Sequence, residues 1–191
     1  MVNLTEQGYL RQPHTSSGRV PSPKAMKFYI SQLMEENQMS LGEEVKSREK
    51  ARVVKDDLDK LMGEVTDDLA EQTGALALSA IDDGRVWRSG LANIFDSPEF
   101  SLEVCRDVFE FLEESGRLRE VFFERMTGLS PVEVLFGEEL GWPHFERVGV
   151  VASRFNINDH DVAIGIIGPV RLKYGDIIPA VRYFSNLLTQ W

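Results

Sequence analysis

The hydrophobic period of the chain changes at Gly74, and this change constrains the fold more than any other feature of the sequence. Before it, apolar residues recur at the three- and four-residue steps of one α-helical face, at Val54, Leu58, Leu61, Val65 and Leu69. After it, the apolar run Ala75–Ile81 has the length of a β-strand and ends in the turn sequence Asp82-Asp83-Gly84. A long helical segment therefore leads into a region that contains a sheet, which excludes an all-helical fold.

The region after Gly74 predicts an antiparallel sheet with helices packed on it. We expect strands over residues 75–81, 85–88, 132–136, 148–155 and 162–167. Apolar spacing predicts helices from Ser97-Pro98 to Gly116, over residues 117–126 and over Tyr174–Leu188. The fold class is therefore α+β, and residues 75–191 form one domain.

Residues 38–74 predict one long linker helix. Ser40-Leu41-Gly42-Glu43 has the spacing of a capping box, and Gly74 suits the C-cap. The apolar stripe is narrow and the remaining surface is densely charged, which is typical of a helix that packs along one partner. Two partners are possible at this point: the sheet domain of the same chain, or the same helix of a second copy.

Residues 1–37 begin with a turn-rich stretch. Residues 8–23 contain three Pro and two Gly, which excludes a helix there. They predict a β-hairpin with strands Tyr9–Gln12 and Gly18–Val20 around the tip Pro13–Ser17. Ser22-Pro23 then has the sequence of an N-cap and a first helical residue. We expect this helix to fade near Asn37, with one apolar face formed by Met26, Ile30, Leu33 and Met34.

Charge is distributed unevenly along the chain. The formal net charge is −10, which by itself argues against contact with a phosphate backbone. Residues 1–30, however, hold four basic side chains and one acidic one, so the remainder carries −13. Arg11 and Arg19 flank the hydroxyl-rich hairpin tip, and guanidinium and hydroxyl groups are what proteins use to hold phosphates. The hairpin is either a nucleic-acid contact or a packing element whose charges are merely solvated.

The sequence offers little support for catalysis or metal binding. Cys105 lies next to an apolar helical face, so we interpret it as a buried structural thiol. The histidines have no metal-ligand spacing, and Glu138-Glu139 fits a solvated turn. The stretch Gly165–Pro169 lacks the lysine of a phosphate loop and fits the end of a central strand. We therefore expect no enzyme activity, no catalytic residue, no metal and no cofactor.

The location of the protein follows from equally simple observations. No apolar run approaches the roughly 20 residues that span a bilayer, so we expect no contact with a membrane. The start MVNLTEQGYL has no basic region followed by an apolar core, so we expect no signal peptide. Cys105 is the only cysteine, which fits a reducing cytoplasm.

Three segments of the chain resemble motifs of a known family, the heat-inducible transcription repressor HrcA. The stretch Gly8-Tyr9-Leu10-Arg11-Gln12-Pro13-His14-Thr15-Ser16-Ser17-Gly18-Arg19-Val20-Pro21 resembles the wing of that family, with Ser17 in place of the usual Ala. Residues 90–100, GLANIFDSPEF, are similar to its Gly-Leu-Ser/Ala-Asn motif, and residues 167–174, IGPVRLKY, to its Ile-Gly-Pro motif. The three motifs occur in the order found in the family.

The resemblance implies a winged-helix DNA-binding region, a GAF-like domain and a homodimer. It also implies double-stranded DNA as a partner, through an inverted-repeat operator of the CIRCE type near chaperone genes, and help from the chaperonin GroEL. The expected DNA-binding residues are those of the wing: Arg11, Gln12, His14, Thr15, Ser16, Ser17, Gly18 and Arg19. In the GAF-like domain, Val150, Ala152, Ile164 and Ile166 look like core residues of a scaffold and not like a cofactor site.

The chain departs from the family pattern at two places. The family places a recognition helix before the wing, and here residues 2–7 resemble only the last turns of that region. The family also inserts a dimerisation subdomain where this chain has only Asp82–Ser89. We therefore expect a partial winged helix over residues 1–37, and DNA binding that is weak and without sequence preference. The alternative function is a GAF-like ligand-binding or protein-interaction module with a vestigial wing.

Overall fold

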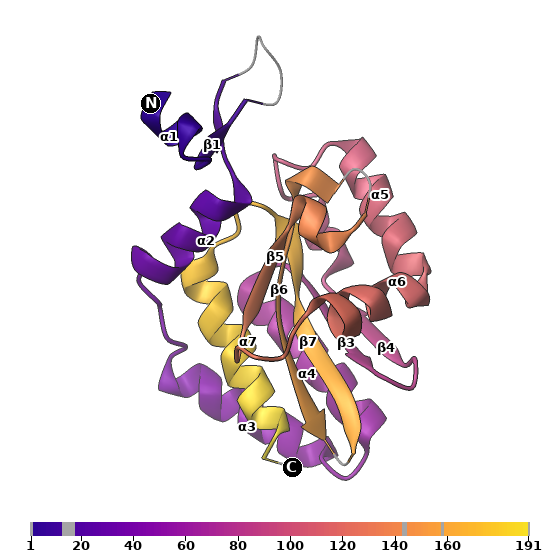
Figure 1. Ribbon diagram of the computed structural model, residues 1–191. Helices are drawn as coiled ribbons and strands as arrows, with labels where there is room; N and C mark the ends of the chain where they lie inside the picture. Colours follow the sequence, from indigo (N-terminus) through magenta and orange to yellow (C-terminus); the bar gives the residue numbers. More distant parts are fainter. Residues whose placement is uncertain (1, 13–17, 143–144, 158, 191) are drawn as a thin grey trace. The chain divides into compact units, whose positions relative to one another are not determined.

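The structure is a computed structural model, and it describes residues 2–12, 18–142, 145–157 and 159–190 (Figure 1). The chain divides into two compact units, Met1–Glu35 and Glu36–Trp191, which we call the head and the body. The body contains a five-stranded sheet in which all neighbouring strands are antiparallel. The α+β class predicted from the sequence is confirmed.

The head consists of α1 (Val2–Glu6), β1 (Leu10–Arg11), β2 (Val20–Pro21) and α2 (Pro23–Gln32). α2 begins where the sequence predicts but ends before the expected position near Asn37. Its predicted apolar face is not enclosed, since no residue of α2 is buried and Leu33 remains 65% exposed. None of the apolar side chains that the structure describes in the head is buried. Two short strands and two short helices offer too little apolar surface to form a core.

The predicted single helix over the charged segment is instead two helices, α3 (Leu41–Val54) and α4 (Leu58–Thr73). The capping box at Ser40 and the left-handed C-cap at Gly74 are both present as predicted. The break occurs because Asp57 leaves helical geometry (φ −126°, ψ 102°) and its side chain caps a new helix by accepting a hydrogen bond from the N–H of Lys60. Apolar spacing continues through the break, which is why it predicted one helix.

The apolar stripe of this segment packs inside the body. Leu61, Val65 and Leu69 are buried, and α4 lies against β3, β4 and α7. α3 differs, because it buries only Ser47 and Ala51. α3 is linked to α4 by Lys50, whose Nζ lies 2.8 Å from Oδ1 of Asp68 and 3.1 Å from Oε2 of Glu71. Of the two partners considered above, the chain's own sheet is therefore the one that the stripe contacts.

The sheet has the strand order β4-β3-β7-β6-β5. Its strands are β3 (Leu76–Ile81), β4 (Val86–Ser89), β5 (Glu133–Phe136), β6 (Val148–Ile157) and β7 (His160–Pro169). All five predicted strands are present, and β6 and β7 extend further than predicted. Gly165 allows the central strands to approach closely, because a Cβ there would lie 2.4 Å from the Cβ of Ala152.

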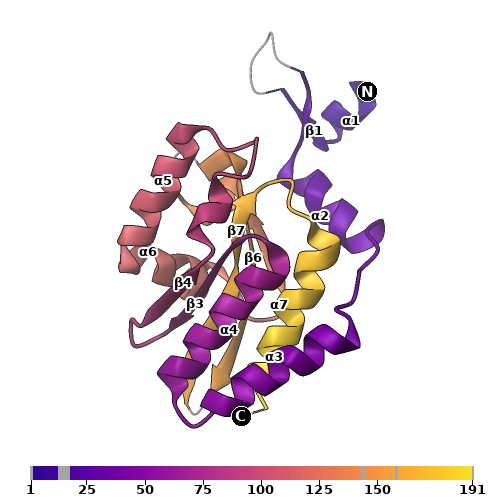
Figure 2. The same ribbon diagram turned by 180° about the vertical axis from the view of Figure 1, so that it is seen from behind.

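Helices cover both faces of this sheet. α4 and α7 (Tyr174–Leu188) lie together on one face (Figures 1 and 2). The other face carries α5 (Leu102–Glu113) and α6 (Ser115–Arg119), with a π-helical turn at Glu120–Arg125. Short 3₁₀ turns lie at Leu91–Ile94, Gly137–Leu140 and Phe145–Arg147. Within the described part of the chain, no helix is long and apolar enough to cross a membrane.

The predicted start of α5 at Ser97-Pro98 is wrong. α5 begins at Leu102, because the side chain of Ser101 accepts a hydrogen bond from the N–H of Val104 and caps it. The helix also ends before Gly116, at Glu113. The segment between Ser97 and Ser101 is an irregular turn that buries Phe100 at the edge of the core.

The core on the α5 side of the sheet is closed by aromatic rings. Phe111 packs against Phe145 and Trp142, with ring centroids 5.1 and 5.5 Å apart. Val150 and Ala152 of β6 belong to the same cluster. Ile164 and Ile166 of β7 are fully buried as well. These four residues are therefore core residues, as the sequence predicts.

Candidate nucleic-acid interface

The head contains the predicted pair of strands, but each has only two residues, and the second is shifted from the predicted Gly18–Val20 to Val20–Pro21. β1 and β2 are antiparallel, with Leu10 opposite Pro21 and Arg11 opposite Val20. The N–H of Ser22 donates to the carbonyl of Tyr9 at 3.0 Å and extends the pairing toward α2. The two strands therefore leave one open end, between Arg11 and Arg19, that carries the tip.

Ser22 connects the hairpin to α2. Its hydroxyl donates to the carbonyl of Gly8 at 2.6 Å and accepts from the N–H of Ala25 at 3.2 Å. Gly8 has a φ of +76°, a backbone conformation that a side chain would strain. Ser22 is only 9% exposed, so both of its hydrogen bonds are shielded from water. One side chain thus caps the helix and fixes the first turn of the hairpin.

Lys24 serves the structure of the head. Its Nζ lies 4.6 Å from the ring centroid of Tyr9 and donates to the carbonyl of Gln7 at 2.9 Å. The Tyr9 ring meets the edge of Phe28 at a centroid distance of 5.7 Å. This small cluster stabilises the hairpin against α2 without enclosing a core. The sequence counted Lys24 only as positive charge, and no spacing rule pointed to its contact with Tyr9.

The predicted DNA-binding residues fall into two groups. Arg11 is half-buried at the end of β1, Gln12 follows it, and Gly18 and Arg19 are exposed immediately before β2. His14, Thr15, Ser16 and Ser17 lie outside the described residues. Because the strands are antiparallel, Arg11 and Arg19 stand on opposite sides of the same hairpin end. The described part of the hairpin therefore has one arginine on each strand side next to the tip residues. Contact of these arginines with DNA stays a prediction.

The other candidate residues have structural surroundings. Cys105 is buried, and burial raises the pKa of its thiol, so it is a structural thiol as predicted. The Glu139 carboxylate accepts from the N–H of Phe136 at 3.0 Å, and the Glu138 side chain is not described. His160 Nδ1 lies 3.2 Å from Oδ1 of Asp82. The remaining histidines lie outside the described residues, within which no metal-ligating group of three side chains is found.

Comparison with known proteins gives the family. Residues 25–178 match the HrcA protein C-terminal domain. The chain belongs to the HrcA family. The match covers most of α2 and nearly the whole body, and the wing-like residues 8–21 lie outside it.

Two curated relatives extend the comparison over the whole chain. The heat-inducible transcription repressor HrcA of Acetivibrio thermocellus is 37% identical over 292 positions, covering 100% of this chain and 83% of the relative. That of Carboxydothermus hydrogenoformans is 22% identical over 293 positions, covering 100% and 85%. Since this chain has 191 residues, about 100 aligned positions of each HrcA relative have no counterpart here.

A solved structure shows the same fold. It is described as the crystal structure of a hypothetical protein, and it superposes with a TM-score of 0.66 at 15% identity. The superposition covers 100% of this HrcA chain and 83% of that chain. The likeness supports the α+β architecture.

Proposed function

We propose that this chain is a DNA-binding transcription repressor that responds to heat, as its HrcA relatives are named. The observation that carries the proposal is the family match combined with the head hairpin, in which Arg11 ends the first strand and the exposed Arg19 precedes the second. The body is acidic and its helices and sheet enclose an ordinary core, so the basic head is the part suited to phosphate. The protein would act in the cytoplasm and without catalysis.

The finer proposal concerns the operator and the partners. An operator of the CIRCE type is an inverted repeat, and a protein reads such a site as a two-fold symmetric dimer. The residues proposed to contact DNA are those of the wing: Arg11, Gln12, His14, Thr15, Ser16, Ser17, Gly18 and Arg19. We propose that residues 1–37 contact DNA, that residues 38–74 connect this region to the rest of the chain, and that residues 75–191 form a GAF-like scaffold. The chaperonin GroEL is the proposed modulator.

The head sets the expected strength of binding. A recognition helix must reach the base edges in the major groove, and α1 has only five residues. The hairpin offers two arginines, and each phosphate contact changes the slope of log affinity against log salt by about 0.9. We therefore expect this chain to bind duplex DNA weakly, without sequence preference, and with a shallow salt dependence.

Fluorescence anisotropy with labelled duplexes tests the proposal. One duplex carries an inverted repeat and the other a scrambled sequence of the same composition. Arg19→Gln removes an exposed guanidinium, so we expect weaker binding to both duplexes and a salt slope smaller by about 1. Arg106→Gln is the matched control, because Arg106 is an exposed arginine of the body, paired with Glu110 on the same helix.

Three results would contradict the proposal. Equal loss in both variants would assign the binding to net charge and not to the head. If neither duplex binds at low salt, the proposed contact between the head and DNA is wrong. Nanomolar binding that distinguishes the inverted repeat would overturn the expected weak, unselective mode. Light scattering on the same samples tests the dimer, because a monomer at every concentration cannot read two half-sites as one unit.

A further inference from the structure

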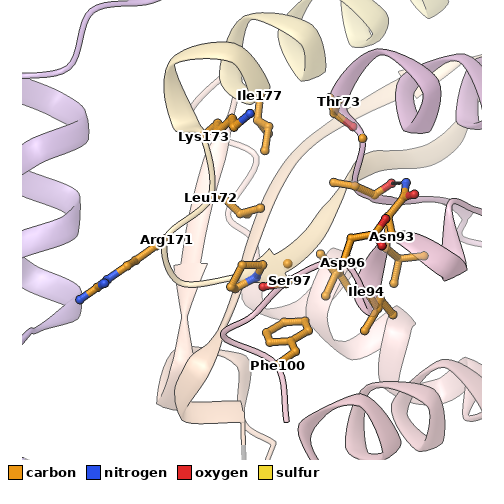
Figure 3. Close-up of a pocket in the computed structure, with 16 residues that line it drawn as sticks. Thr73, Asn93, Ile94, Asp96, Ser97, Phe100, Arg171, Leu172, Lys173 and Ile177 are labelled. Atoms are coloured by element: carbon orange, nitrogen blue, oxygen red, sulfur yellow. Dashed lines mark hydrogen bonds between the residues drawn. The ribbon is translucent and has the colours of Figure 1, made fainter. Parts of the chain in front are cut away.

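A cavity of about 290 Å³ opens at one end of the body's sheet (Figure 3). One wall comes from the junction of α4 and β3 and from the segment Asn93–Phe100. The opposite wall comes from the end of β7 and the turn into α7, residues 167–173. These walls contain two of the three segments by which the sequence resembles its family, although about 70 residues separate them in the chain.

The floor of the cavity is apolar. It is formed by buried side chains from four different elements: Leu76, Ile94, Phe100, Ile167 and Ile177. In Figure 3, Ile94 and Phe100 stand on one side of the space, and Leu172 and Ile177 on the other. A site of this kind favours a ligand with an apolar body, because burial of that body releases water from both surfaces.

Both walls are fixed by hydrogen bonds of their own. The side-chain amide of Asn93 donates to the carbonyl of Ala75 at 3.1 Å, which joins the two parts of the first wall. In the second wall, the hydroxyl of Tyr174 donates to the carbonyl of Val170 at 2.5 Å, and the N–H of Val170 donates to the carbonyl of Arg147 at 2.9 Å. A ligand therefore meets a preformed cavity, so binding needs little reorganisation of the protein.

The rim of the cavity is positive although the body as a whole is acidic. Most basic side chains of the body pair with acids, as Lys50, Arg85 and Arg182 do. Arg171 and Lys173 line the cavity, and their side chains make no hydrogen bond or ion pair with the residues that the structure describes. Asp96 supplies the single carboxylate among the lining residues. The N-terminus of α7 at Tyr174 adds a partial positive charge beside the two cations.

We propose that this cavity binds a small organic anion. Its apolar body would lie on the floor between Phe100 and Ile177, and its carboxylate or phosphate group would lie at the rim near Lys173. The Arg171 side chain extends away from the cavity in Figure 3, so Lys173 is the cation proposed to meet the anionic group. Thr73, Asn93 and Ser97 add uncharged polar side chains to the lining. The site goes beyond the proposed DNA contact and does not depend on it.

Calorimetric titration of the full chain tests this site with three probes: benzoate, phenyl phosphate and the neutral benzamide. We expect both anions to bind in the submillimolar to millimolar range and benzamide to bind at least several-fold more weakly. The double variant R171Q/K173Q should lower the affinity for the anions by about tenfold, because it removes both cations among the lining residues. Arg119→Gln, an exposed arginine on α6 outside the cavity lining, is the matched control and should bind as the unmodified chain does.

A second variant tests the cavity without changing its charge. Ser97→Phe places a ring from the half-buried rim into the space, so it should abolish binding of all three probes. Its melting temperature shows whether the fold survives the substitution. Equal affinities for benzoate and benzamide would show that the cavity does not recognise negative charge, which would contradict the proposal. Unchanged affinity in R171Q/K173Q or in a folded S97F protein would place the ligand elsewhere, and no binding of any probe at millimolar concentration would overturn the site.

Discussion

The head and the body are stabilised in different ways. The body encloses a continuous apolar core on both faces of its sheet, whereas none of the described apolar side chains of the head is buried. The head instead relies on the hydrogen bonds of Ser22 and on the cluster of Tyr9, Lys24 and Phe28. The buried apolar side chains that stabilise the fold therefore lie in the body, whereas the head carries exposed basic side chains. Mutations in the two units should give separate signatures, which the following predictions exploit.

The largest effect is expected from the aromatic core of the body. Phe111 is 1% exposed and touches the rings of Trp142 and Phe145. Phe111→Ala should lower the free energy of unfolding by about 3–5 kcal/mol, because it removes a buried ring and leaves a cavity. Phe28→Ala in the head, where the ring is 45% exposed, should change it by less than about 1 kcal/mol. Urea denaturation measures both, and comparable losses would show that the head encloses Phe28 in solution.

A smaller effect is expected where α3 is joined to α4. The Asp68 side chain is 2% exposed, and Lys50 is its charged partner at 2.8 Å. The Asp68 carboxylate raises the pKa of the Lys50 ammonium, which shows that the pair favours its charged form. Lys50→Met leaves the buried carboxylate without a cation and should destabilise the protein by about 2 kcal/mol.

The double variant K50M/D68N separates charge from packing. Asn in place of Asp68 removes the buried charge, so the double variant should recover much of the stability lost in K50M. If D68N fails to rescue K50M, the methylene chain of Lys50 and not its charge connects α3 to the body. Urea denaturation of the four proteins, including D68N alone, completes the cycle.

A local effect is expected in the head. Ser22→Ala removes the cap of α2 and the bond to Gly8, and loss of a cap costs about 1 kcal/mol. Because the head lacks a buried core, this loss should appear as faster amide hydrogen exchange in α2 and not as a lower unfolding midpoint of the body. Ser40→Ala, which removes the cap of α3, is the matched control and should leave exchange in the head unchanged. A shift of the body midpoint in S22A would contradict the separation of the two units.

The sequence predicts what is set by near neighbours along the chain. The caps at Ser22, Ser40 and Gly74 and the closing helix Tyr174–Leu188 follow from short-range spacing, and all are present. One local signal gave a wrong helix start because an equivalent signal lies nearby. Ser97-Pro98 resembles a helix start, but Ser101 four residues later provides the cap.

The cavity could not be predicted in this way. Its walls come from residues 73–76, 93–100 and 167–177, which only the sheet pairing of β3 with β7 brings together. The residue spacing within any one of these segments does not predict that the segment lies next to the other two. The wing is the opposite case, since Arg11 and Arg19 are eight residues apart and a hairpin alone places them at one end. A candidate site formed by near neighbours in the chain can therefore be predicted from the sequence, whereas one assembled by the sheet cannot.

The smallest effect is expected from Glu36, the first residue of the body. Its carboxylate accepts two hydrogen bonds from Arg182 of α7, at 2.6 and 2.8 Å, and this contact holds its pKa below the usual value of 4.5. A lowered carboxyl pKa contributes stability that is present above the unfolded pKa and is lost as the pH falls through the folded one. The free energy of unfolding should therefore drop below about pH 4.5 by less in Glu36→Gln than in the unmodified protein. The difference should stay below about 1 kcal/mol, because both side chains are about one-third exposed. Urea denaturation at pH 7 and pH 4 measures it, and identical pH dependence in the two proteins would show that this ion pair does not help to hold α7 at the start of the body.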